Sequence, residues 1–418
     1  MKKLTQTLLS YFKSLRGFGI SIILLLTFVS VPFITTDLYF GLNWYYPVII
    51  TLFFVLVCSF TLDILKNDWK IYILEKNHKD LICLWIILCF GFFLFGLYHL
   101  FFNYSLIEMR VFIGNLVKFT IIVVLIIYLT VDYEKFTDGL LFLVAIMSLL
   151  SIILFLLITF DLYPIKPAEV HYKNRLNYNF WLGNSNVYLR SEGGQTIRIS
   201  GFLEEPGAFA LILTFSIVLN EWFRKSTLLH GIFIVAGILT FSLAFYISLG
   251  IFIVYFLLKK LKFITYLQLF SCFLIFIYYA AFFSSNTELS NLVKYTIARF
   301  TYDPITGGFG GNYNRFEGGI ETKSLGFGNG LGADPGVFSI QTYLSTYGLF
   351  VGITSFLFLP FLLVSVLKKK GSPAILLWLV IAINFIQRPD VALLPIMVFL
   401  TLIYLAPGGR VARYPSLG

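Results

Sequence analysis

Blocks of about 20 apolar residues, separated by short polar segments, dominate this sequence. A helix of that length crosses a hydrocarbon layer about 30 Å thick. The pattern therefore predicts an all-α fold, a polytopic bundle of transmembrane helices. The blocks lie near residues 17–36, 44–62, 81–102, 111–131, 139–160, 206–221, 226–258, 262–283, 339–367, 373–387 and 390–406.

The block at 226–258 decides the number of spans. It is too long for one upright helix, and we expect two short helices with a hinge near Thr240–Ser242. The chain then has twelve spans and both ends on one side. The inner segments hold 19 of the 31 Lys and Arg residues, and the outer segments hold 11, mostly in two long loops. Because Lys and Arg are enriched in short cytoplasmic loops, this arrangement places both termini in the cytoplasm.

Two long outer loops divide the predicted bundle. Such loops in a compact protein are usually functional or disordered, and aromatic residues such as Trp181, Tyr188 and Phe309 argue against disorder here. The expected segments are helices 1–5 in 1–160, the first loop in 161–205, helices 6–9 in 206–283, the second loop in 284–338, helices 10–12 in 339–406 and a cytoplasmic tail in 407–418.

Composition excludes several classes of protein. Hydrophobic residues make up 58% of the chain and charged residues 12%, which rules out a soluble enzyme, a secreted disulfide scaffold and a disordered chain. The formal charge of +10 follows from the cationic inner loops, so we expect no nucleic-acid partner. All four cysteines lie within apolar blocks, which favours packing over a disulfide framework or a zinc site.

Three arginines lie toward the predicted outer face. Arg198 precedes the span at 206, Arg315 lies in the glycine-rich second loop, and Arg388 lies in the turn between the last two spans. Guanidinium binds phosphate through two parallel hydrogen bonds, each charge-assisted contact contributing roughly 1.5–3 kcal/mol. If the arginines converge, they suit a lipid-linked phosphate or pyrophosphate. The alternative for each is an anchor to lipid headgroups.

A pair of carboxylates precedes the same span. Glu204 and Glu205 come directly before Pro206, a residue well tolerated in the first turn of a helix. Glu205 is a helix cap in one interpretation and a general base in the other. The sequence contains no DxD pair, HExxH, phosphate-binding loop or GxSxG, so it predicts no metal site, no cofactor and no serine nucleophile.

The segments around these residues resemble the superfamily of O-antigen polymerases (Wzy) and O-antigen ligases. RISGFLEEPG matches the pattern of Arg, Gly, an aromatic residue and Glu-Pro at the entry to a span. LTFSLAFYISLGIFIVY resembles the hinged pair of short spans that follows, and NYNRFEGGIETKSLGFGNGLG resembles the large outer loop. QTYLSTYGLFVGITSFLFL, with Gly348 and Gly352, resembles the next span. The resemblance covers roughly residues 190–400, and the hinged pair lacks the arginine that often follows its serine in relatives.

The resemblance implies a glycosyltransferase on the outer face of a bacterial inner membrane. Its donor would be a glycan on undecaprenyl pyrophosphate, and its acceptor a hydroxyl on another lipid-linked repeat unit. Glu205 would be the catalytic base, and Arg198, Arg315 and Arg388 would hold the pyrophosphate without a metal. Membrane lipids and a chain-length regulator protein are the other expected partners. The alternatives are a ligase, which transfers finished glycan to another acceptor, and a flippase or transporter of lipid-linked oligosaccharide.

Overall fold

The computed structural model is mainly helical. It describes residues 54, 76–102, 106–160, 162, 168–172, 175–180, 183–189, 195–201, 203, 206–258, 302–303, 308–309, 326–330, 340–371, 373–387 and 394–406. The expected spans near 17–36, 44–62 and 262–283, most of the second loop and the tail at 407–418 lie outside these residues, apart from Phe54. The described part follows the expected α-helical architecture.

Several helices have the length and composition of membrane spans. Within the described residues, four stretches of 18 or more residues qualify: Asp80–Phe102, Phe136–Ile158, Pro206–Phe223 and Tyr343–Lys368. Shorter apolar helices accompany them. In chain order the helices are α3 (Lys76–Phe102), α4 (Leu106–Thr159), α5 (Pro206–Phe223), α6 (Thr227–Leu239), α7 (Leu243–Leu258), α10 (Ile340–Phe356), α11 (Phe358–Lys370), α12 (Ala374–Gln387) and α13 (Leu394–Leu405). These are the helices of an α-helical membrane protein.

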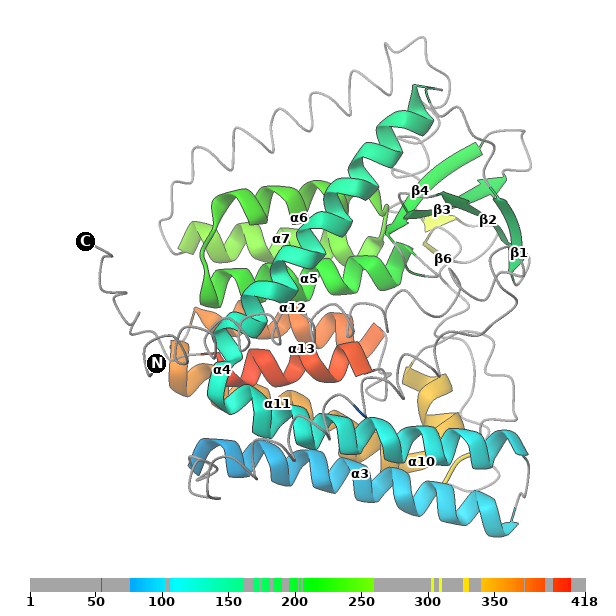
Figure 1. Cartoon of the computed structure of the whole chain (residues 1–418), viewed down its shortest axis with the longest axis vertical. Helices are drawn as coiled ribbons and strands as arrows, with labels where there is room; N and C mark the ends of the chain where they lie inside the picture. Colours follow the sequence, from blue (N-terminus) through cyan, green and yellow to red (C-terminus); the bar gives the residue numbers. More distant parts are fainter. Residues whose placement is uncertain are drawn as a thin grey trace, which may run out of the picture.

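Helix α4 joins two predicted spans without a break. Its 54 residues would extend about 80 Å as a straight rod, far more than one crossing needs. Figure 1 shows that α4 runs beside α3, turns, and then runs toward the sheet as a second leg. The segment 132–138, expected as a short loop, contains neither glycine nor proline to end the helix.

The first long loop contains a β-sheet that the hydrophobic pattern did not predict. Four antiparallel strands form a meander in the order β1-β2-β3-β4, with Asn186 opposite Arg198 in the last pair. Connections of two residues separate the first three strands, which are β1 (Ala168–Tyr172), β2 (Arg175–Phe180), β3 (Gly183–Leu189) and β4 (Gln195–Gly201). Strands β3 and β4 contact α4, and β4 also contacts α5 and α6. The sheet therefore packs on one end of the helical bundle (Figure 1).

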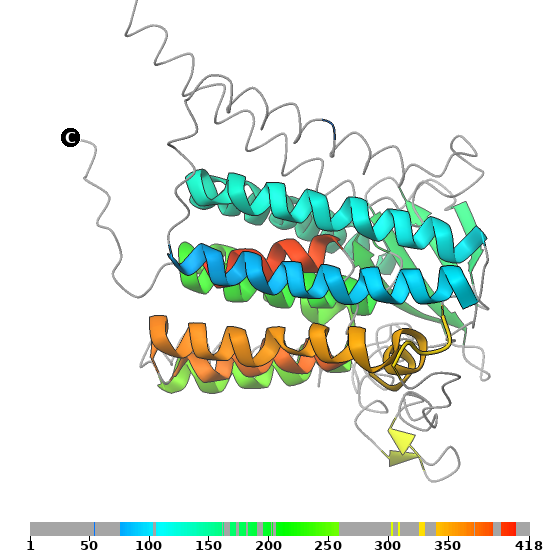
Figure 2. The ribbon, with the colours of Figure 1, turned by 90° about the horizontal axis from the view of Figure 1, so that it is seen from below.

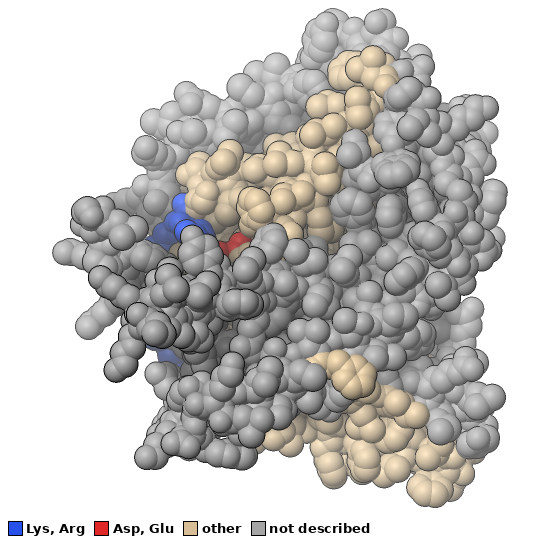
Figure 3. All heavy atoms as spheres, in the orientation of Figure 1, with Lys and Arg blue, Asp and Glu red and all other residues tan. Residues whose placement is uncertain are grey.

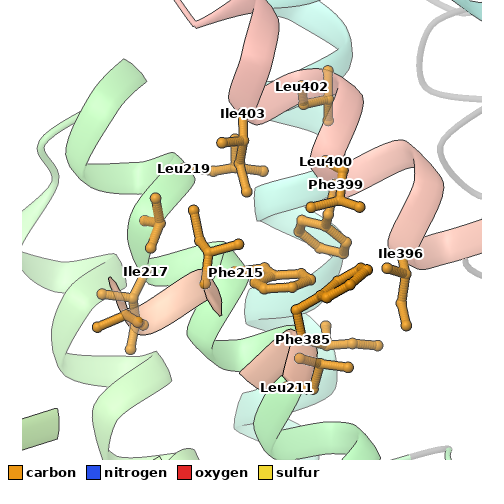
Figure 4. Packing of buried hydrophobic residues seen from close by; sticks show 14 of the residues in the cluster. Leu211, Phe215, Ile217, Leu219, Phe385, Ile396, Phe399, Leu400, Leu402 and Ile403 are labelled. Atoms are coloured by element: carbon orange, nitrogen blue, oxygen red, sulfur yellow. The ribbon is translucent and has the colours of Figure 1, made fainter. Parts of the chain in front are cut away.

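Helix α5 lies in the centre of the bundle. Of the residues in its most apolar stretch, 83% are buried inside the protein, whereas the corresponding share for the other three long apolar stretches is 39–44%. Figure 4 shows α5 side chains packing against α12 and α13, with the rings of Phe215 and Phe399 5.8 Å apart. Because lipid tails are as apolar as leucine, close packing rather than escape from water holds such helices together. The surroundings of α5 are protein, not lipid.

The two ends of the bundle differ in composition. Figures 1 and 2 show the α5–α6 and α11–α12 connections at the end away from the sheet. There Arg224 forms an ion pair with Asp138 of α4. Lys225 follows Arg224 in the chain, and Lys368 lies in the last turn of α11. On the face drawn in Figure 3, the described Lys and Arg atoms gather toward this same end. These cations belong to segments predicted as inner from the charge distribution.

Candidate functional site

A hinge between α6 and α7 lies beside the sheet. Helix α6 ends at Leu239 and α7 begins at Leu243, which confirms the hinge predicted near Thr240–Ser242. Phe241 has φ 49°, a left-handed conformation that costs a bulky residue roughly 1–2 kcal/mol. Gly237 permits the tight reversal, because a Cβ there would lie 1.9 Å from the ring of Phe245. The hinge is thus a strained but closely packed turn.

Arg198 of β4 holds this hinge. Its Nε donates to the Thr240 carbonyl at 2.9 Å, and its Nη2 donates to the Phe241 carbonyl at 3.2 Å. The residue is only 5% exposed. Carbonyls at a helix C-terminus lack partners within the helix and carry partial negative charge, which favours a cation there. Hydrogen bonds from a charged donor contribute about 1.5–3 kcal/mol each.

The chain turns directly from Arg198 into the central helix. Ile199 and Ser200 are fully buried, and Gly201 turns the chain with φ 62° above the ring of Phe209. The Leu203 N–H then donates to the Ser200 carbonyl, and α5 begins at Pro206. The predicted entry to a span at Pro206 is confirmed. Glu204 and Glu205 lie outside the described residues.

The last turns of α12 lie against the first turns of α7. Asn384 is buried and donates from Nδ2 to Ser248 Oγ at 2.7 Å and to the Val380 carbonyl at 2.8 Å. Ser248 in turn donates to the Ala244 carbonyl. The end of α12 at Gln387 therefore shares one end of the bundle with the hinge. Arg388 follows Gln387 in the chain and lies outside the described residues.

The second long loop contributes a short segment that inserts into a broken helix. Gly348 interrupts α10 with φ 73° and ψ −178°. The N–H of Phe350 would bond to the Thr346 carbonyl in an unbroken helix, but it donates to the Gly326 carbonyl at 3.1 Å. The Thr346 carbonyl instead accepts from the Gly330 N–H at 3.1 Å. The loop backbone thus replaces the helical hydrogen bonds that the break removes.

Helix α3 holds the same segment from the other side. His99, fully buried, donates from Nε2 to the Phe327 carbonyl at 2.8 Å. The ring of Tyr98 stacks on the ring of Phe327 at 4.3 Å. Arg315, the remaining predicted phosphate ligand, lies outside the described residues. The segment Gly326–Gly330 is thus a packing element between α3 and the two halves of α10.

One cluster at the far end of the bundle was missed from the sequence. Glu221, His230 and Tyr255 lie together between α5, α6 and α7. A carboxylate at the end of an apolar block, nine residues before a histidine, was the available signal. No group of three His, Cys, Asp or Glu residues able to hold a metal occurs in the described part of the chain.

Comparisons with known proteins return no family model, no curated protein and no solved structure that matches this chain. The class of protein follows from the apolar helices of the described residues: this is an α-helical membrane protein. The segment between α4 and α5 carries a small antiparallel sheet.

Proposed function

We propose that the chain is a polysaccharide polymerase of the O-antigen or capsule type, with twelve spans and both termini in the cytoplasm. It transfers glycan from undecaprenyl pyrophosphate to a hydroxyl of another lipid-linked repeat unit, at the outer face of a bacterial inner membrane. The proposal rests on the resemblance of residues 190–400 and on one structural observation. That observation is a buried guanidinium, Arg198, at the joint between the loop sheet and the α6–α7 hinge.

The proposed chemistry uses Glu205 and the three arginines. The acceptor oxygen bonds to the anomeric carbon while the bond from that carbon to the pyrophosphate oxygen breaks. The acceptor hydroxyl gives its proton to the Glu205 carboxylate, and undecaprenyl pyrophosphate leaves as an anion. Arg198, Arg315 and Arg388 neutralise the charge that develops on the leaving group, so the step needs no metal.

Covalent connectivity supports this assignment for two residues outside the described part. Glu205 precedes Pro206, the first residue of α5, and Arg388 follows Gln387, the last residue of α12. The helix ends that these two residues adjoin in the sequence, Pro206 and Gln387, lie at the end of the bundle that carries Arg198. A carboxylate and arginines are the groups that a pyrophosphate-linked donor requires.

Elongation by the purified full chain tests the proposal. The protein is reconstituted in vesicles with single-repeat undecaprenyl-pyrophosphate glycan, extracted from cells that lack the chain. A polymerase makes a ladder of products. Glu205→Gln abolishes the ladder, whereas Glu204→Gln, a matched change one residue away, leaves most of it. A near-normal ladder from Glu205→Gln removes that carboxylate from the mechanism.

The same assay separates the two alternatives. A ligase produces no ladder from lipid-linked repeats alone and transfers glycan only when a different acceptor is added. A flippase moves labelled lipid-linked glycan across the vesicle membrane without lengthening it. Either result replaces the polymerase assignment.

A further inference from the structure

One side-chain hydrogen bond joins α12 to α7 inside the apolar core. Asn384 Nδ2 donates to Ser248 Oγ at 2.7 Å, although the two residues are 136 positions apart in the chain. Ser248 is fully buried and Asn384 is 2% exposed. The bond therefore connects two packed helices in a place where water does not compete for the same groups.

The partners of the Asn384 amide fix its orientation. Nδ2 also donates to the Val380 carbonyl, four residues earlier on α12, at 2.8 Å. A carbonyl oxygen only accepts, so the nitrogen of the amide, and not its oxygen, must face Val380. The Ser248 hydroxyl donates to the Ala244 carbonyl at 2.8 Å, which leaves its oxygen free to accept from Asn384. Every donor in this chain of bonds has an acceptor, so the relative position of the two side chains is well defined.

The bond lies near the hinge end of both helices. Helix α7 begins at the hinge whose carbonyls Arg198 holds, and α12 ends at the same end of the bundle. Ser248 comes five residues after the start of α7 at Leu243, or about 7.5 Å along its axis. Asn384 comes three residues before the end of α12 at Gln387, or about 4.5 Å along its axis. The bond thus ties the end of α12 to the hinge side of α7.

The expected effect of this bond is on position more than on stability. Side-chain hydrogen bonds between membrane helices add little net stability, because the separated helices find other partners for the same groups. A leucine in place of Asn384 would avoid the cost of burying an amide. A bond of defined length and direction, however, restricts how far two helices can slide or rotate against each other.

We propose that Asn384 is a positioning residue for glycan transfer: through Ser248 it fixes the end of α12, which Arg388 follows in the sequence, relative to the hinge that Arg198 holds. The inference rests on the proposed polymerase function, in which both arginines bind the pyrophosphate. Asn384 itself makes or breaks no bond of the substrate. Displacement of a positioning group by about 1 Å can lower a rate about 100-fold, so loss of the bond should slow elongation much more than it destabilises the protein.

An exchange of the two residues tests the bond itself. Asn384→Ser and Ser248→Ala each remove one partner. The double variant Asn384→Ser/Ser248→Asn moves the amide to α7 and the hydroxyl to α12. Each side chain again has a carbonyl four residues earlier on its own helix, and the amide can again donate to the hydroxyl. Ser148→Ala is the matched control, because Ser148 is fully buried and donates to the Val144 carbonyl of its own helix.

Elongation kinetics in the vesicle assay give the first measurement. Asn384→Ser and Ser248→Ala should lower kcat about 10- to 100-fold, while KM for single-repeat undecaprenyl-pyrophosphate glycan changes less than about threefold. The double variant should return to within about threefold of the wild-type kcat, and Ser148→Ala should stay within about twofold of it. Near-normal kcat in both single variants, or a double variant as slow as Asn384→Ser, overturns the proposal.

A second measurement follows the end of α12 and needs no activity. Spin labels on Ile386→Cys and Leu228→Cys, in a chain whose four native cysteines are replaced, report the distance between the end of α12 and the start of α6. Both positions are exposed, at 41% and 73%, so the labels do not disturb the core. The distance distribution should broaden or shift in Asn384→Ser and Ser248→Ala, return in the double variant, and stay unchanged in Ser148→Ala.

The two measurements separate this inference from the polymerase assignment. A distance distribution that is the same in wild type, Asn384→Ser and Ser248→Ala overturns the positioning role, whatever the ladder shows. If wild type makes no ladder but the distribution broadens in the single variants, the polymerase proposal fails alone and the connection between α12 and the hinge stands.

Discussion

The break in α10 gives a quantitative prediction. In Gly348→Ala, the new Cβ would lie 2.3 Å from the Gly326 carbonyl oxygen and 2.5 Å from the Gly328 nitrogen. Real Cβ atoms do not approach backbone so closely, and backbone cannot rotate away as a flexible side chain can. The inserted segment must therefore shift, and its hydrogen bonds to α10 must stretch or break.

A second glycine separates the two costs of this substitution. Gly371, which caps α11, has φ 79° and ψ −177°, almost the same conformation as Gly348, but nothing lies within 4 Å of a Cβ placed there. Alanine in this region of the backbone map costs about 1–3 kcal/mol at either position. Only Gly348→Ala also disturbs the bonds from Phe350 to Gly326 and from Gly330 to Thr346, at about 1 kcal/mol each, or more where an amide is left buried and unpaired.

We therefore expect Gly348→Ala to lower the free energy of unfolding by about 2–4 kcal/mol more than Gly371→Ala does. Reversible unfolding of the purified full chain in mixed detergent measures both values against wild type. Arg315 lies eleven residues before Gly326, so the polymer ladder should also shorten in Gly348→Ala. Equal destabilisation by the two substitutions would show that the inserted segment does not hold α10 as described.

Three further predictions concern the hinge, the α5–α6 turn and the proposed catalytic base. Arg198→Lys removes the paired donors to the hinge carbonyls, so it should lower the free energy of unfolding by about 2–4 kcal/mol. Arg224→Lys, at an exposed ion pair, should change the free energy of unfolding by less than about 1 kcal/mol. The same unfolding assay measures both variants. Lys225→Gly relieves a positive φ at an exposed turn and should raise the free energy of unfolding by about 0.5–1 kcal/mol. A melting temperature below that of wild type would contradict the left-handed turn. Glu205→Gln should lower the rate of elongation at least 100-fold, against little change for Glu204→Gln, as measured by the length of the ladder.

The features predicted correctly from the sequence depend on local properties. The apolar helices α3, α5 and α12 follow from uninterrupted apolar runs. The hinge at Thr240–Ser242 follows from a run too long for one helix and too short for two full ones. The start of α5 at Pro206 follows from the restriction of proline to first turns. Each depends on a few neighbouring residues, and distant parts of the chain do not change it.

The features that were missed depend on partners far away in the chain. The strands of the first loop are short and polar. They are stabilised by packing on helices far away in the chain: β3 and β4 contact α4, and β4 contacts α5. The continuity of α4 through 132–138 is another example, since charged residues are compatible with both a loop and a helix. The insertion of Gly326–Gly330 into α10 depends on hydrogen bonds between backbone groups, which any sequence carries. The glycines are therefore the only feature of the sequence that indicates this insertion.

By itself, the sequence determined that this is a membrane protein, where several of its helices begin and end, and which side chains have the chemistry to bind a phosphate. The tertiary structure decided what those side chains contact. Arg198 bonds to carbonyls 42 and 43 residues away, and Glu221 is buried beside His230 and Tyr255 from two other helices. Apolar length is a property of a segment, whereas a hydrogen-bond partner or a buried charge depends on which segments the fold brings together.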